Sequence, residues 1–230
     1  GFLTNETLFS ITEQPERLAI VGAGPIGCEM AQTFQRLGTQ VTLIDNSDRI
    51  FSKEDPDALD ILEETFRHEG IEIRTDVTLE NVSTSNGSKI LTLHAGDDTE
   101  TITVNEILVG VGRTPNIESL GLDAVGVEYD KYGVQVNDRL QTTNKKIFAA
   151  GDVCLPYKFT HTADAAARIV IQNALFMGRS KVSDLVVPWT TYTEPEIAHV
   201  GMYEEEATEA GIEIQTFRRE MKDVDRAKLD

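Results

Sequence analysis

Cysteine is almost absent from this sequence of 230 residues, which holds only Cys28 and Cys154, far apart in the chain. Two thiols in these positions exclude a disulfide framework and a closely spaced redox pair of the Cys-x-x-Cys kind. Cys28 falls in the first turn of a predicted helix, where a thiol pKa can be lowered. We favour the interpretation that it is a small buried residue.

Histidines, basic residues and long apolar runs are also scarce. The sequence has four histidines, His68, His94, His161 and His199. None of them has the spacing of a metal-ligand pair, so we expect no metal site. Lys and Arg number 21 against 39 Asp and Glu, and the net charge of −18 disfavours a nucleic-acid partner. Without a membrane-length apolar run or a charged-then-apolar leader, we expect a soluble, cytoplasmic protein with no membrane partner.

The most informative segment is an apolar run that leads into a Gly-x-Gly-x-x-Gly pattern at residues 18–27. The apolar run predicts a strand, and the glycines after it predict a tight turn. A helix is predicted to follow, because the apolar residues after the turn recur at helical spacing: Ile26, Met30, Phe34 and Leu37. Gly22 permits the turn, Gly24 lets a pyrophosphate approach the backbone, and Gly27 lets the helix pack close to the strand. Pro25 and Ile26 open the helix, whose N-terminus favours phosphate, and we count them as cofactor-binding residues as well.

An acidic residue ends the next predicted strand. Residues 39–45 read as a parallel strand with Asp45 at its carboxyl end. A carboxylate there can accept hydrogen bonds from an adenosine ribose and repels the 2′-phosphate of NADP, so NAD is favoured. Arg49 lies close enough in sequence to leave NADP open. The alternative for the whole pattern is a glycine-rich turn in an ordinary α/β domain.

Helices and strands alternate along the rest of the sequence. Asp55 is expected to cap a helix that runs to Gly70 and buries Leu59, Leu62 and Phe66. Further strands are expected at residues 71–74, 79–83, 89–94 and 99–104, of which the last three form an antiparallel meander. The segment 106–116 is expected to be an apolar strand that ends in a Gly-Arg-x-Pro-Asn turn. A second module is expected to contain a hairpin at 129–134, a short buried strand at 146–150 and a helix at 163–177. The final segment is expected to contain a strand from about 186, a helix at 203–210 and a strand at 212–217.

Five motifs in order resemble the flavin-dependent pyridine nucleotide-disulfide oxidoreductases, nearest the lipoamide dehydrogenase and mercuric reductase branch: GAGPIGCE, VTLID, VGRTPN, IFAAGD and TYTEPEIAHVG. The resemblance covers essentially the whole chain and implies an α/β fold. A connector (1–14) would lead into a Rossmann-type, three-layer NAD-binding domain with an antiparallel meander (15–116). The C-terminal part of an FAD-binding domain (117–185) and the first part of an α+β dimerisation domain (186–230) would follow.

The resemblance also assigns site residues. It implies that Gly22, Gly24, Gly27 and Asp45 hold NAD, that Glu29 lies near the nicotinamide, and that Gly112 and Arg113 line the return from the nucleotide domain. For FAD it implies Gly151, Asp152 on the ribityl chain, and Thr160 and His161 at the start of a helix directed at the flavin. From the residues alone, alternatives stay open. Glu29 can be a carboxylate favoured in a first helical turn, Arg113 a surface ion pair, and Asp152 a turn or capping carboxylate.

Departures from the family pattern shape the functional hypothesis. The sequence has one Gly-x-Gly-x-x-Gly and no redox cysteine pair, and His199 does not match the family's acid-base histidine. We therefore expect a segment, inactive alone and without catalytic residues, of a homodimeric FAD-dependent enzyme. That enzyme would pass hydride between NADH, flavin and a disulfide or dithiol substrate. The alternatives are a stand-alone NAD-binding regulatory module and an NADH oxidase or peroxidase-type flavoprotein.

Overall fold

The computed structural model describes residues 1–228, so the last two residues of the predicted 186–230 segment lie outside the described residues. Contacts divide the chain into two compact units, Gly1–His199 and Val200–Asp230. The first unit holds the predicted glycine motif and every residue assigned to a cofactor.

A parallel sheet of four strands organises the first unit, in the order β3-β2-β1-β7. The strands are β1 (Arg17–Val21), β2 (Gln40–Ile44), β3 (Glu72–Arg74) and β7 (Glu106–Val109). Leu18 of β1 pairs with Val41 on one side and with Glu106 on the other. Strands buried on both faces need near-continuous apolar sequences, which is why 18–21 and 107–109 read as unbroken apolar runs.

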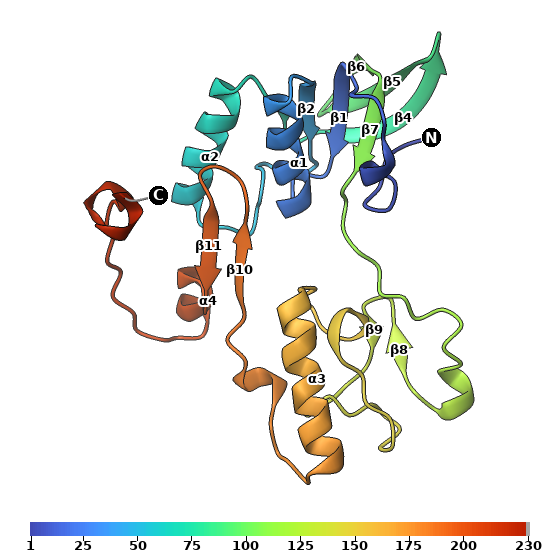
Figure 1. Ribbon diagram of the computed structural model, residues 1–230, viewed down its shortest axis with the longest axis vertical. Helices are drawn as coiled ribbons and strands as arrows, with labels where there is room; N and C mark the ends of the chain where they lie inside the picture. The colour runs from blue at the N-terminus through green and yellow to red at the C-terminus, as the bar shows by residue number, and fades with distance from the viewer. Residues whose placement is uncertain (229–230) are drawn as a thin grey trace. The chain divides into compact units, whose positions relative to one another are not determined.

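Helices cover one face of this sheet and an antiparallel meander covers the other (Figure 1). The meander consists of β4 (Thr78–Ser85), β5 (Ser88–Ala95) and β6 (Asp98–Val104). Because side chains alternate along a strand, Leu18 and Ile20 pack with α1 (Pro25–Arg36) and α2 (Pro56–His68), whereas Ala19 packs with the meander. The predicted three-layer α/β class with an antiparallel meander is confirmed.

The buried face of α1 agrees only in part with the predicted pattern of apolar residues. Ile26 is 41% exposed and Leu37 is 65% exposed, so neither belongs to the core. The inward positions are taken by small residues and one aromatic residue: Gly27, Cys28, Ala31 and Phe34. The helix lies so close to the sheet that small side chains fill much of the contact. Of the four large apolar residues of the predicted pattern, Phe34 and Met30 therefore pack in the core, whereas the two end residues do not.

The start of α2 is predicted in the right place and Pro56 opens the helix as expected, but the predicted side-chain cap is wrong. Asp55 is the residue that precedes the helix, yet its side chain makes no capping hydrogen bond. Its main-chain carbonyl instead accepts the N–H groups of Ala58 and Leu59. The predicted buried face is confirmed, because the side chains of Leu59, Leu62 and Phe66 are almost completely buried.

Residues 117–185 have a small hydrophobic core of their own, centred on Leu140, Leu155, Ala166 and Ile169. They form the hairpin of β8 (Tyr129–Asp130) and β9 (Gly133–Val134) and the helix α3 (Thr160–Leu175). The strand predicted at 146–150 is wrong: the described residues show one isolated bridge there, between Gln141 and Phe148, and no pairing with β1. A strand needs a neighbour along its length, and no described strand lies beside this one.

The last segment begins with the hairpin of β10 (Pro188–Thr191) and β11 (Ile197–Val200). In the second unit, α4 (Glu204–Glu209) confirms the predicted helix, and Glu206 accepts the N–H of Tyr203 before it. The strand predicted at 212–217 is wrong, because these residues are exposed and pair with no described strand. No helix among the described residues has the length and apolarity needed to cross a membrane.

The first residues also take part in the sheet. Leu3, inside the expected connector, lies against the outer edge of β7, where it forms a parallel bridge with Leu108. Its N–H donates to the Ile107 carbonyl (2.7 Å), and its carbonyl accepts the N–H of Val109 (3.0 Å). Its side chain is buried in the core that also contains α1 and α2.

Candidate functional site

The turn between β1 and α1 fits only glycine at two of its positions. Gly22 has φ +103°, and a Cβ there would stand 2.6 Å from the carbonyl oxygen of Gly110, just after β7. A Cβ on Gly27 would stand 1.9 Å from the carbonyl oxygen of Gly22. Both distances are far below van der Waals contact. These two glycines let the turn pass between β7 and α1, so the fold itself requires them.

Gly24 is different, because a Cβ on it would meet no atom within 4 Å. Its φ is −77°, which any residue can adopt, so neither strain nor packing requires glycine there. It precedes α1, and no side chain caps the helix. Helix N-termini carry unpaired N–H groups and the positive end of the helix dipole. The open side of Gly24, with Pro25 and Ile26 exposed beside it, is a surface on which a phosphate group can contact the backbone.

Asp45 lies at the carboxyl end of β2, as predicted, and its carboxylate faces the glycine turn. Oδ2 accepts the N–H of Ala23 (2.6 Å), and Oδ1 accepts the N–H of Ser47 (2.8 Å). Partial burial works to raise the pKa of this carboxyl, but the backbone donors outweigh it and hold the pKa below its ordinary value. Asp45 is therefore an ionised carboxylate, fixed in orientation, beside the cradle that Gly24 opens.

Arg49, left open by the sequence as a partner for a 2′-phosphate, is engaged elsewhere. Its Nη2 lies 2.7 Å from Asp60 Oδ1, and its Nε lies 3.4 Å from Glu63 Oε1, both on α2. A guanidinium held by two carboxylates has less charge to offer an incoming phosphate.

Glu29 lies in the second turn of α1, because the helix begins at Pro25 and its first turn contains no acidic residue. The interpretation of Glu29 as a first-turn carboxylate favoured by the helix dipole is therefore wrong, since that effect falls off beyond the first turn. Its Oε1 instead accepts the N–H of Tyr192, which follows β10 (2.9 Å).

Residues assigned to the two different cofactors meet in the segment after β7. Gly112 has φ +117°, and Arg113 follows it. The Arg113 Nη1 donates to the Lys158 carbonyl (2.9 Å) and lies 3.4 Å from Asp152 Oδ2, while Lys158 Nζ donates to the Arg113 carbonyl (2.6 Å). Arg113 and Asp152 are both about half exposed, so this is a surface ion pair that a ligand can reach.

The other residues assigned to flavin lie around the start of α3, which begins at Thr160 with no side-chain cap. Thr160 and His161 are exposed. His161 Nε2 donates to the Pro188 carbonyl (2.8 Å). Gly151 approaches the helix so closely that a Cβ there would lie 3.0 Å from Ala163 Cβ. The start of α3 is thus exposed, and the Gly151 turn packs against its first turn.

Sequence reasoning missed an aromatic contact centred on Trp189, in β10. The indole stacks on His199 with ring centres 4.4 Å apart and on Tyr157 at 5.9 Å. Its Nε1 donates to Glu54 Oε1, which precedes α2 (2.8 Å). The only signal in the sequence was that Trp189 is the sole tryptophan.

The two thiols are protected. Burial, followed by the charges of Asp45, Glu29 and Glu63, raises the pKa of the Cys28 thiol well above its ordinary value. Burial also raises the pKa of Cys154 to about 11. The structure therefore agrees with the interpretation of Cys28 as a small buried residue and disagrees with a lowered pKa of its thiol.

At neutral pH we expect both cysteines of the folded chain to react with an aromatic disulfide reagent much more slowly than free cysteine, because thiolate is the nucleophile. Unfolding in guanidinium should make both thiols reactive at once. The absorbance of the aromatic thiolate that the reagent releases measures the reaction. Fast stoichiometric labelling of the folded chain at neutral pH would contradict the raised pKa values.

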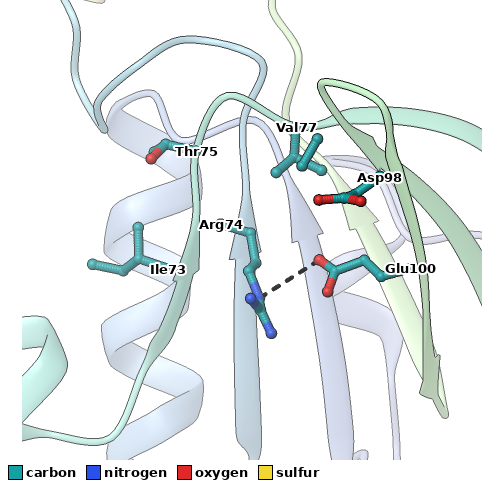
Figure 2. A pocket seen from close by; sticks show the side chains of 7 residues that line it. Ile73, Arg74, Thr75, Val77, Asp98 and Glu100 are labelled. Atoms are coloured by element: carbon teal, nitrogen blue, oxygen red, sulfur yellow. Dashed lines mark ion pairs between the residues drawn. The ribbon is translucent and has the colours of Figure 1, made fainter.

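A hollow of about 340 Å³ lies elsewhere, between the end of β3 and the meander. Figure 2 shows Arg74 directed toward Glu100, with 3.9 Å between Nε and Oε1, and Asp98 beside it. These carboxylates make the hollow unfavourable for phosphate groups, so we do not place the nucleotide there. Among the described residues, no group of three or more His, Cys, Asp or Glu side chains is arranged to hold a metal ion.

Comparison with known proteins identifies the family of the chain. The family profile described as "Pyridine nucleotide-disulphide oxidoreductase" matches residues 2–168, and that of its dimerisation domain matches residues 187–230. A mercuric reductase of Staphylococcus aureus is 37% identical over 230 residues, which are all of this chain and 42% of the relative. A dihydrolipoyl dehydrogenase of Thermus scotoductus is 36% identical over 204 residues, which are 87% of this chain and 44% of the relative.

A solved structure of the HOCl-induced flavoprotein disulfide reductase RclA from Escherichia coli is also similar. It superposes with a TM-score of 0.88 at 29% identity, over all of this chain and 52% of that one. The chain thus spans less than half the length of both curated relatives. With the profile match over most of its length, the chain belongs to the pyridine nucleotide-disulphide oxidoreductase family.

Proposed function

We propose that this chain supplies the NAD-binding domain and one wall of the flavin site of an FAD-dependent NADH:disulfide oxidoreductase. The enzyme acts on a disulfide or dithiol, or on a metal ion as the mercuric reductases are named for, and works as a cytoplasmic homodimer. Gly24 carries the proposal: it is a glycine that the fold does not require, at an uncapped helix N-terminus. A ligand that approaches the backbone explains it.

The residues around Gly24 fit a dinucleotide. Backbone around Gly24, Pro25 and Ile26 would hold the pyrophosphate, and Asp45 would hold the adenosine ribose through hydrogen bonds to its hydroxyls. Glu29 would lie on the nicotinamide side, and Gly112 and Arg113 would border it; these last three assignments rest on the family resemblance. NAD, when bound, supplies hydride transfer, and this chain's residues bind and orient it.

The residues around α3 fit part of a flavin site. Asp152 presents a half-exposed carboxylate next to Gly151, and Thr160 and His161 leave the start of α3 open. Helix N–H groups directed at a flavin would stabilise negative charge on its ring. Arg113 currently pairs with Asp152, so a ribityl hydroxyl would share that carboxylate with the guanidinium.

Calorimetric titration of the purified chain with NADH, together with its visible absorption spectrum, tests this proposal. We expect binding at one site and no flavin absorption, because the only Gly-x-Gly-x-x-Gly pattern in the sequence is the one assigned to NAD. Absence of NADH binding by a folded chain would contradict the nucleotide assignment. A yellow chain that carries stoichiometric FAD would show that the flavin site is more complete than one wall.

A further inference from the structure

One side of α1 holds the turn between β10 and β11. Three α1 residues at helical spacing, Glu29, Gln32 and Arg36, make hydrogen bonds or ion pairs with residues 192–194 of that turn. Positions three and four apart lie on one face of a helix, so these side chains form a continuous stripe. The opposite side of the same helix packs on the sheet, and its N-terminus faces the proposed dinucleotide.

Gln32 makes the central contact. Its side chain is buried, and its amide contacts the main chain of Glu194 twice: Nε2 donates to the carbonyl (2.8 Å), and Oε1 accepts the N–H (2.7 Å). This is the pattern by which one strand pairs with another, made here by a side chain. Nε2 also lies within hydrogen-bond distance of Glu69 Oε1. Loss of this amide would remove both central hydrogen bonds between α1 and the turn and leave the Glu194 N–H and carbonyl without their protein partner.

Arg36 contributes an outer contact. Its Nη1 lies 2.6 Å from Glu194 Oε2, and its Nη2 lies 2.6 Å from Glu69 Oε1. Because Glu194 is largely exposed, this ion pair is screened and contributes little to stability. The position of the turn therefore depends mainly on the buried amide of Gln32.

The turn between β10 and β11 also positions the Glu29 carboxylate. Tyr192 lies two residues before Glu194, and its N–H donates to the Glu29 carboxylate. If the turn separated from α1, Glu29 would lose this donor, and its carboxylate would be free to rotate away from the nicotinamide side of the proposed site. A binding group that must be ordered when the ligand arrives contributes less affinity than one already held in place.

We propose that Gln32 is a positioning residue that couples dinucleotide affinity to the β10–β11 hairpin. It holds the turn on α1, the turn fixes the Glu29 carboxylate, and the fixed carboxylate is already oriented for the nicotinamide side of the bound dinucleotide. The coupling rests on the proposed NAD site at the α1 N-terminus. Because such coupling is reciprocal, bound NADH should in turn stabilise the hairpin.

A double-mutant cycle on the full chain tests the route through Glu29. We expect Gln32→Ala to weaken NADH binding about fivefold. In a Glu29→Ala background the same change should weaken binding by less than about twofold, because the side chain through which it acts is gone. Thr33→Ala is the matched control, since Thr33 is exposed on α1 and its hydroxyl donates only to the Glu29 carbonyl within the helix. Equal losses in both backgrounds would show a merely structural role and overturn the proposal.

Trp189 gives a second measurement that does not require NADH. As the sole tryptophan, in β10, it reports on the hairpin by fluorescence, while circular dichroism reports on the whole chain. We expect the two thermal transitions to coincide in the unchanged chain and the fluorescence transition to occur first in Gln32→Ala. Coincident transitions in Gln32→Ala would overturn the proposal. If the unchanged chain binds no NADH, the proposed function fails, and this fluorescence result alone decides whether Gln32 holds the hairpin.

Discussion

Replacement of Gly27 by alanine is expected to abolish NADH binding and to lower the free energy of unfolding by about 3 kcal/mol. The new methyl group would stand 1.9 Å from the Gly22 carbonyl oxygen, which is main chain and has no flexible side chain to move aside. Either α1 must move off the sheet, or the β1–α1 turn must rearrange. Both changes remove the helix N-terminus from the place where the proposed phosphates bind. Urea unfolding followed by circular dichroism and calorimetry with NADH measure the two effects.

Gly24→Ala is the matched comparison. Its Cβ would meet no atom within 4 Å, and its backbone conformation suits alanine, so the stability of the chain should change by less than about 1 kcal/mol. NADH affinity should nevertheless fall about tenfold or more, because the methyl group would occupy the space through which a pyrophosphate approaches. Undiminished NADH binding by Gly24→Ala would contradict the placement of the dinucleotide at this turn.

Asp45→Arg is expected to invert the cofactor preference, from NADH toward NADPH. The unchanged carboxylate can accept hydrogen bonds from a ribose but repels a 2′-phosphate, whereas a guanidinium attracts one. The ratio of the two affinities should change on the order of 100-fold, because discrimination by an unpaired or repelled polar group is large. Calorimetric titrations with NADH and NADPH under identical salt measure it. NADPH binding as tight as NADH binding in the unchanged chain would contradict the assignment.

Asp45→Asn is the control for charge at constant shape. It retains an oxygen for one of the Ala23 and Ser47 donors and should narrow the preference without inverting it. The same variant tests the lowered pKa. A carboxyl with a lowered folded-state pKa stabilises the fold above its ordinary pKa, and this stabilisation is lost as the pH falls through the folded-state value. The unchanged chain should therefore lose more stability in acid than Asp45→Asn.

The nucleotide half could be predicted from the sequence because its signals are local. A buried parallel strand must be apolar on both faces, and a turn between strand and helix needs glycine where backbones approach. The strand and turn at 18–27 were therefore placed correctly, and the strand predicted at 39–45 agrees with β2 to within one residue at each end. The strands predicted at 146–150 and 212–217 show the limit. A short run of apolar residues indicates that the backbone favours an extended conformation. A strand also needs a second strand to pair with, and the sequence does not say where that second strand lies.

Long-range polar contacts were the other limit. Gln32 and Glu194 are 162 positions apart, and nothing about either residue type indicates the other. The same holds for Trp189 and Glu54. Glu29 shows a subtler error, because a shift of one residue in the helix start decides whether a carboxylate lies in the first turn or the second. Helix ends are the least certain part of any sequence-based prediction.

The contact between Leu3 and β7 bears on edge-to-edge pairing of the parallel sheet with another chain. The outermost strand of an open sheet presents unpaired N–H and C=O groups that another chain can use as a template. Here the β7 border is occupied, since Leu3 takes the Ile107 carbonyl and the Val109 N–H. The opposite border, β3, is only three residues long and carries the paired charges of Glu72 and Arg74. Both edge strands of the sheet are thus protected against pairing with another chain. Removal of the residues up to Leu3 would expose the unpaired backbone groups of β7 to other molecules in solution.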